Sequence, residues 1–146
     1  MKTVAELLRT KSNTFLYSVD ADDSLLDGLR IMAEKGVGAL VVLSGGRMVG
    51  IVSERDYVRK AALADRSMLD AKVNTIMTRE VISVSPRDNL QYCMQLMTER
   101  RLRHLPVLAE GELIGLLSIG DLVKETIAEQ ADLIRQLEQY IRGEIP

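Results

Sequence analysis

The sequence contains little cysteine, little proline and few aromatic residues. Its 146 residues include one cysteine, three prolines, one phenylalanine and no tryptophan. With Cys93 alone, no disulfide can form within the chain, and this predicts a reducing compartment, the cytoplasm. Leu, Ile, Val, Met and Ala must therefore build the core, and the apolar content of 47% is sufficient for one globular fold.

The sequence also lacks long apolar runs and a dominant charge. No run approaches the roughly 20 residues needed to cross a bilayer, so no membrane association is expected. The first 13 residues carry Glu6 and no long apolar stretch, which does not fit a secretory signal. The net charge is −2, with both signs spread along the chain, and this argues against nucleic acid as the main partner.

An internal repeat is the strongest feature that is present. Residues 15–60 align without gaps with residues 80–125, a shift of 65, and 14 of the 46 pairs are identical. About three would be expected by chance. Upstream, residues 4–9 match 73–78 with a shift of 69, so the first repeat has four extra residues near 11–14. The chain is a duplicated unit.

Each unit predicts the order β-α-β-β-α. A short β run (15–19; 81–84) leads into a polar turn, with Asp23 and Asp88 among the residues that favour a helix start. An amphipathic helix follows, and two apolar runs around a glycine-containing turn then predict a β-hairpin (39–43 and 48–52; 105–108 and 113–117). One unit is too small to bury both faces of its sheet, so we expect an α/β (α+β) fold in which two pseudo-twofold units pack through their sheets.

These patterns divide the chain into one module of two units. We assign residues 1–65 to the first unit, 66–72 to a linker, 73–128 to the second unit and 129–146 to an extension of the last helix. An apolar stripe continues through that helix to about Arg142. A helix of this length that overhangs a small domain usually has a partner for its far end, which predicts a homodimer or another protein partner.

Both units contain the motif Gly-apolar-apolar-Ser-x-x-Asp, at Gly50–Asp56 and Gly115–Asp121. One interpretation is structural: the serine and aspartate form a capping box for the next helix. The other is a ligand site, because a strand-to-helix turn is where open α/β layouts bind nucleotides. A carboxylate repels phosphate but accepts hydroxyl groups, so the aspartates suit ribose, and the serines and nearby amides suit phosphate.

Basic residues near the motifs differ between the units. Arg103 and His104 precede the second hairpin, where the first unit has Gly38 and Ala39. Arg55 lies inside the first motif, where the second unit has Gly120. The alternative interpretation of the arginines at 100, 101 and 103 is a solvated helix end. Lys11, in the inserted stretch, is a weaker candidate to reach one cleft. We expect the two clefts to hold phosphate differently.

The chain resembles a CBS pair of the small stand-alone bacterial type. The resemblance rests on these two motifs, on VNTIMTREVISVSP at 73–86 and on RHLPV at 103–107. The resemblance covers nearly the whole chain. It implies clefts between the units that bind adenine nucleotides such as AMP, ADP, ATP or NAD(H), sometimes S-adenosylmethionine, and a disc-shaped dimer. It implies ribose on Asp56 and Asp121, phosphate near Ser53, Arg55, Ser118, Arg103 and His104, and adenine against the segments around Ala39, Pro106 and the first β runs. The full set of expected nucleotide-binding residues is Ser18, Val19, Ala39, Ser53, Arg55, Asp56, Ser83, Val84, Arg103, His104, Pro106, Ser118, Gly120 and Asp121.

The leading hypothesis is thus a non-catalytic regulatory module that binds an adenine nucleotide and signals to a partner. An enzyme is the less favoured class, because Cys93 lies on an apolar helical stripe and neither a zinc-ligand cluster nor a P-loop occurs in the sequence. No catalytic cofactor and no metal are expected. The remaining alternative is a ligand-free oligomerisation or interaction module that acts through its C-terminal helix.

Overall fold

The computed structural model describes residues 2–11, 16–61 and 69–143. Some predictions fall outside these ranges. They are the start of the first β run at Phe15, most of the inserted stretch, the end of the first unit with part of the linker (62–68), and the last three residues.

The first unit has the predicted order of elements. Its sheet contains β1 (Ser18–Asp20), β2 (Ala39–Ser44) and β3 (Arg47–Ser53), with β1 parallel and β3 antiparallel to β2. Helix α2 (Leu25–Lys35) lies between β1 and β2, and α3 (Glu54–Asp56) continues into a π-helical turn, Tyr57–Ala61. The N-cap of α2 is Ser24, directly after the acidic turn that was predicted to start it.

The second unit repeats this arrangement with α4 (Leu90–Arg100), β4 (His104–Ala109), β5 (Glu112–Ser118) and α5 (Ile119–Ile141). The two hairpins have the same register. Ala39 lies opposite Ser53 in the first, and His104 lies opposite Ser118 in the second. The predicted hairpins and the long C-terminal helix are therefore confirmed.

The second unit differs from the prediction in its first strand. The β run expected at 81–84 is reduced to one parallel bridge, between Val84 and Val107. In the first unit, Val41 N donates to Tyr17 O and Ala21 N donates to Leu43 O. The corresponding residues of the second unit are Pro106 and Pro86. Because proline has no N–H, neither ladder hydrogen bond can form, and the strand shortens to the residue between them.

The N-terminal segments of the two units are exchanged. Helix α1 (Val4–Thr10) packs on the second unit, where Val4 N donates to Asp88 O at 2.7 Å. The equivalent segment of the second repeat packs on the first unit, where Val73 N donates to Asp23 O at 2.8 Å. Each core therefore contains residues of both repeats: Val73, Ile76 and Met77 join the first, and Val4 and Leu7 join the second.

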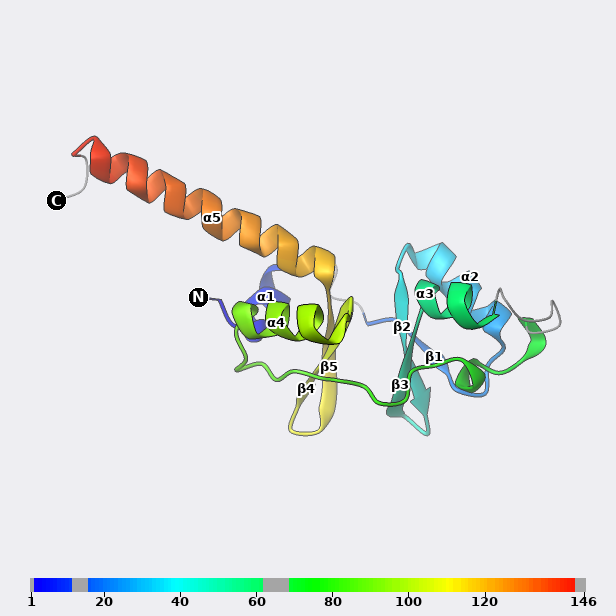
Figure 1. Cartoon of the computed structure of the whole chain (residues 1–146). Coiled ribbons are helices and arrows are strands. Elements are labelled where there is room, and N and C mark those ends of the chain that lie inside the picture. The colour runs from blue at the N-terminus through cyan, green and yellow to red at the C-terminus, as the bar shows by residue number, and fades with distance from the viewer. Residues whose placement is uncertain (1, 12–15, 62–68, 144–146) are drawn as a thin grey trace.

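The two sheets face each other between the helices of the two units, as Figure 1 shows. The first turns of α5 lie over α1 and α4, and the rest of α5 projects away from the body. Among the described helices, none is long and apolar enough to cross a membrane. The face-to-face arrangement brings the ends of β3 and β5, which carry the repeated motif, to the region between the units.

Candidate functional site

Both copies of the serine–aspartate motif form capping boxes. Ser53 N donates to Asp56 Oδ2 at 2.9 Å, and Asp56 N donates to Ser53 Oγ at 3.3 Å. In the second copy, Ser118 N donates to Asp121 Oδ2 at 2.8 Å, and Asp121 N donates to Ser118 Oγ at 3.1 Å. The structural interpretation is thus confirmed. It does not exclude ligand binding, because a carboxylate has about four lone-pair sites and the cap uses only part of them.

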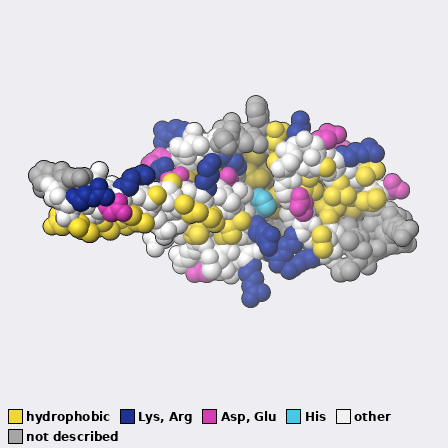
Figure 2. Space-filling model, turned by 90° about the horizontal axis from the view of Figure 1, so that it is seen from above, with side chains coloured by type: hydrophobic (Ala, Val, Ile, Leu, Met, Phe, Trp, Pro, Cys, Tyr) yellow, Lys and Arg dark blue, Asp and Glu magenta, His cyan; other side chains and the backbone are white. Residues whose placement is uncertain are grey.

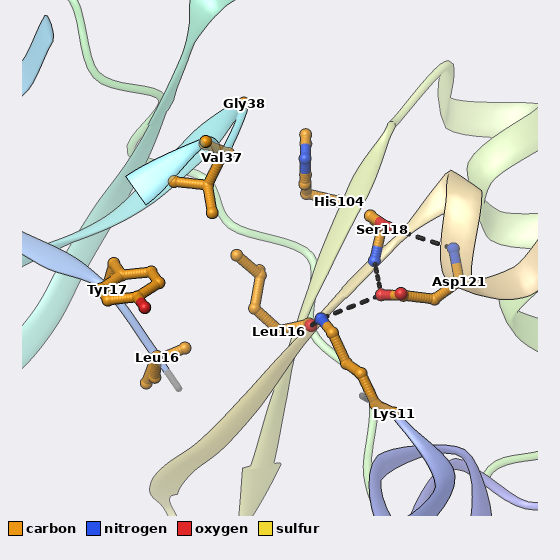
Figure 3. A pocket seen from close by; sticks show the side chains of 11 residues that line it. Lys11, Leu16, Tyr17, Val37, Gly38, His104, Leu116, Ser118 and Asp121 are labelled. Atoms are coloured by element: carbon orange, nitrogen blue, oxygen red, sulfur yellow. Dashed lines mark hydrogen bonds and ion pairs between the residues drawn. The ribbon is translucent and has the colours of Figure 1, made fainter. Parts of the chain in front are cut away.

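One cavity, the Asp121 cleft, lies between the units and has a volume of about 250 Å³. Figure 3 shows its two sides: Leu16, Tyr17 and Val37 approach from the first unit, and Ser118 and Asp121 lie across from them. The first-unit wall is largely apolar and the second-unit wall is polar. The cleft can therefore hold a flat apolar ring on one side and hydroxyl groups on the other. The lining residues are Lys11, Leu16, Tyr17, Gly36, Val37, Gly38, Ala39, His104, Leu116, Ser118 and Asp121.

A second cavity, the Asp56 cleft, has a volume of about 420 Å³. It combines the first motif with the chain that precedes β4. In Figure 2 several Lys and Arg side chains gather beside the histidine, which is the only one in the chain. The lining residues are Gly38, Ile51, Ser53, Glu54, Arg55, Asp56, Arg59, Lys60, Thr78, Arg101, Leu102, Arg103 and His104. Gly38 and His104 line both cavities, so the two clefts share a wall.

The predicted site residues divide into two groups. Eight line a cavity: Ala39, Ser118 and Asp121 line the Asp121 cleft, Ser53, Arg55, Asp56 and Arg103 line the Asp56 cleft, and His104 lines both. The other six line neither: Ser18, Val19, Ser83, Val84, Pro106 and Gly120. Val19 and Val84 are buried in the two cores.

Sequence reasoning missed the apolar wall of the Asp121 cleft and three basic residues of the Asp56 cleft. Leu16 and Tyr17 lie just before the residues that were predicted to contact adenine. Lys60 follows Asp56 by one helical turn, a spacing that could have indicated it. The sequence favours a solvated helix end for Arg101 as much as a ligand site, and no local pattern indicates Arg59.

A lysine neutralises each motif aspartate. Lys11 Nζ lies 3.0 Å from Asp121 Oδ2 and donates to Leu116 O at 2.7 Å. Lys60 Nζ lies 3.5 Å from Asp56 Oδ1 and donates to Ile76 O at 3.0 Å. Each lysine therefore joins the capping carboxylate to a neighbouring backbone carbonyl. The weaker expectation that Lys11 reaches one cleft is confirmed.

Electrostatics disfavour the charged form of His104. Its pKa lies below the ordinary value of about 6.5, chiefly because of burial and also because of Lys11 and Arg103 nearby, while Asp121 acts in the opposite direction. The imidazole is therefore neutral at pH 7. An anion placed in either cleft would oppose this depression, because it would favour the protonated ring.

This depression predicts a pH effect on stability. When the folded-state pKa is below the unfolded value, the unfolded chain binds more protons in the interval between them. The free energy of unfolding should therefore fall as the pH drops from about 6.5 toward the folded pKa. Urea unfolding of the wild type and His104→Gln above and below this interval measures the effect. An identical pH difference in both proteins would contradict it.

The structure gives no support to cysteine chemistry. Cys93 is buried in the second core, as expected from its helical stripe. Burial raises the pKa of its thiol to about 11, so the thiol is protonated at neutral pH. Within the part of the chain that the structure describes, no three His, Cys, Asp or Glu side chains cluster as metal ligands would.

The family model of the CBS domain matches the sequence twice, over residues 4–62 and 73–128. The chain belongs to the CBS-domain family. The two matches make it a tandem CBS pair, and each includes one capping aspartate. A curated relative, CBS domain-containing protein CBSX3, mitochondrial, of Arabidopsis thaliana, is 37% identical over 150 residues, which cover 97% of this chain and 72% of the relative.

Solved structures of CBS proteins have the same fold. A protein with CBS domains from Burkholderia ambifaria MC40-6 superposes with a TM-score of 0.84 at 51% identity, covering 88% of this chain and 96% of that one. The structure of CBSX2 in complex with AMP gives a TM-score of 0.73 at 26% identity, covering 88% of this chain and 98% of that one. A CBS pair of similar size and fold thus binds an adenine nucleotide.

Proposed function

We propose that this CBS pair is a non-catalytic regulatory module that binds adenine nucleotides, such as AMP, ADP, ATP or NAD(H), in its two clefts. The observation that carries the proposal is the position of Asp56 and Asp121. Each is held by its capping box at the edge of a separate cavity between the units. The AMP complex of the related CBSX2 supports the ligand class. The reducing cytoplasm stays the predicted compartment.

The Asp121 cleft suits a nucleoside. The capping hydrogen bonds occupy Oδ2 of Asp121 and leave Oδ1 available for ribose hydroxyl groups. The Tyr17 ring and the Val37 side chain lie across the cavity from Asp121, and the Leu116 side chain extends from β5 toward them (Figure 3). An adenine ring can pack there, because aromatic and aliphatic surfaces bury a flat heterocycle favourably.

A lysine beside each motif aspartate is available to a ligand phosphate. Lys11 pairs with Oδ2 of Asp121 in this structure, which leaves Oδ1 for the ribose hydroxyls. Lys11 lines the cavity and has a flexible side chain, so its ammonium group can move to a ligand phosphate without leaving the cleft. Lys60 is placed to do the same beside Asp56.

Helix α5 connects the Asp121 cleft to the outside of the molecule. Asp121 lies in the first turn of α5, and the far part of the helix projects from the body (Figure 1). A ligand that moves Asp121 would therefore move the projecting part. We propose that α5 pairs with α5 of a second copy of this chain, which forms the homodimer through which the nucleotide state is transmitted.

The binding proposal is tested by isothermal titration calorimetry with AMP, ADP, ATP and NADH. Loss of one carboxylate–ribose interaction should weaken binding at its own cleft by about tenfold or more. Asp121→Ala and Asp56→Ala are therefore each expected to remove or weaken one of two binding events, and the double variant both. Because the same aspartates cap helices, thermal unfolding of each variant must show that it is folded.

Asp132→Ala, an exposed aspartate of α5 that lies away from both clefts, is the matched control and should bind like the wild type. Unchanged affinity in both folded cleft variants would remove the aspartates from the site.

A second candidate function is an interaction module that binds no nucleotide and acts through α5 alone. It is favoured by the exposed apolar side chains of this helix, from Val123 to Ile141. The same titrations separate the candidates, because a ligand-free module shows no heat with any nucleotide and yet self-associates.

A further inference from the structure

We propose that the two clefts take ligands with different numbers of phosphates. The Asp56 cleft binds a nucleoside di- or triphosphate, and the Asp121 cleft binds a nucleoside or a nucleoside monophosphate. This inference rests on the proposed function, which supplies the nucleoside. It is carried by three pairs of equivalent positions that hold arginine on the Asp56 side and glycine on the Asp121 side.

The pairs follow from the repeat shift of 65. They are Arg101 and Gly36, Arg103 and Gly38, and Arg55 and Gly120. All three arginines line the Asp56 cleft. Gly36 and Gly38 line the Asp121 cleft, and Gly120 lies between Ser118 and Asp121 of the second motif. The pseudo-twofold arrangement therefore places guanidinium groups around one cleft and leaves the corresponding positions of the other without side chains.

The charges of the two linings differ accordingly. The Asp56 cleft has five cationic side chains, Arg55, Arg59, Lys60, Arg101 and Arg103, against Glu54 and Asp56. The Asp121 cleft has one cation, Lys11, against Asp121. None of the four arginines of the Asp56 cleft forms an ion pair with any residue that the structure describes. Guanidinium groups that have no anionic partner among the described residues repel one another around this cavity, and they match the geometry and charge of a polyphosphate.

The backbone of Arg101 supports a role in binding. Arg101 ends α4 in the left-handed conformation, with φ of 55°, and Gly36 ends α2 in the same way, with φ of 65°. This conformation is strained for a residue with a Cβ and unstrained for glycine. The helix cap alone therefore favours glycine at position 101. In the proposed complex, contacts of the Arg101 side chain with ligand phosphate offset this cost.

The sizes of the cavities agree with this assignment. The Asp56 cleft, at about 420 Å³, has more room beyond the ribose than the Asp121 cleft, at about 250 Å³. The larger cavity is also the one with the cations, so additional phosphates gain charge-assisted hydrogen bonds there.

Calorimetry in the full-length Asp121→Ala background tests the assignment, because binding at the Asp121 cleft is then removed or weakened and the tighter event belongs to the Asp56 cleft. Arg101→Gly and Arg103→Gly are each expected to weaken ATP binding by about tenfold, the usual effect of losing one charge-assisted hydrogen bond, with a much smaller effect on AMP. Arg101→Gly should also raise the thermal midpoint of unfolding, because it removes backbone strain. Arg100→Ala is the matched control, because this exposed neighbour in α4 lines neither cavity, and it should leave ATP affinity unchanged.

Two results would overturn the inference while leaving the proposed function intact. One is that AMP and ATP bind the Asp121→Ala protein with equal affinity and that the arginine substitutions weaken the binding of both nucleotides equally. The other is that Arg100→Ala weakens ATP binding as much as Arg101→Gly. The loss of affinity would then come from the lower net positive charge and not from a contact in the cleft. By contrast, the absence of binding of both AMP and ATP to the wild type would contradict the proposed function itself.

Discussion

Replacing Gly50 with alanine is expected to lower the free energy of unfolding by about 2–3 kcal/mol, the upper part of the range for overpacking a core. A Cβ at this position would lie 2.7 Å from the backbone oxygen of Thr78 and 2.8 Å from Met77 Sδ. The Thr78 backbone is fixed, because it exchanges hydrogen bonds of 3.0 and 2.8 Å with Ile51 in β3. Room for the methyl group can be made only by moving the segment that contains Met77 and Thr78, which comes from the second repeat, away from the sheet of the first unit.

Gly115, the equivalent glycine of the second motif, is the matched comparison. Its added Cβ would meet Leu8 Cδ2 at 2.8 Å, which is the end of a flexible side chain. Gly115→Ala should therefore cost about 1 kcal/mol, and little in a Leu8→Ala background, where the space is free. Urea unfolding of the four variants and the wild type measures these differences. Equal losses for Gly50→Ala and Gly115→Ala would contradict the argument.

These glycines show where the sequence was informative and where it was not. The two copies of the motif identify it in the sequence, but they do not indicate the role of its first residue. Gly50 and Gly115 are required because the N-terminal segment of the other repeat crosses the hairpin at this point. Local patterns could not indicate this crossing, because it depends on which unit each N-terminal segment joins.

The exchange of N-terminal segments between the units cannot be predicted from the sequence, because the two repeats are alike at this point. Val4 and Val73 make the same hydrogen bond to Asp88 and Asp23. A segment packed on its own unit could make an equivalent bond, so the two arrangements have the same local sequence requirements. Hairpins, helices and capping boxes were predictable because their signals lie within a few residues.

The candidate site was predictable to the same extent. Ser53, Asp56, Ser118 and Asp121 were found because a motif marks them. The lysine partners of the aspartates were harder to find, because Lys11 reaches Asp121 only through the tertiary fold. The shortened first strand of the second unit was predictable in principle, since Pro86 and Pro106 stand where the ladder needs N–H donors.

Substitutions in the exposed apolar face of α5 are expected to have the second large effect, on self-association. Ile134→Glu combined with Leu137→Glu is expected to weaken the proposed homodimer by at least about a hundredfold, because each copy would bury unpaired charges in the interface. The apolar side chains along α5 follow alternating steps of four and three residues, at 123, 127, 134, 137 and 141, with Gln130 as the one polar member. This is the spacing of a coiled-coil seam, and all five apolar members are exposed in the single chain.

The charges beside the seam favour an antiparallel pair. When the helices run in opposite directions about a midpoint near position 132, Val123 faces Ile141 and Ile127 faces Leu137. The flanking Lys124 then lies opposite Glu138 of the second copy, and the symmetry gives this ion pair twice. In a parallel pair, the same flanking positions face Ile119 and Leu133, so no ion pair forms. An antiparallel seam also leaves the two globular bodies at opposite ends of the helices, which differs from the disc-shaped dimer that the family resemblance implies.

A charge exchange separates the two orientations. Glu138→Lys should weaken the dimer, and Lys124→Glu together with Glu138→Lys should restore it, because the pairs are rebuilt with reversed sign. In a parallel pair neither change would have this reciprocal effect. Light scattering coupled to size-exclusion chromatography measures the mass, and Gln139→Glu, on the face of α5 opposite the seam, controls for added charge. A dimer that survives Ile134→Glu with Leu137→Glu would place the interface elsewhere, and a monomeric wild type would remove the second copy as the partner of α5.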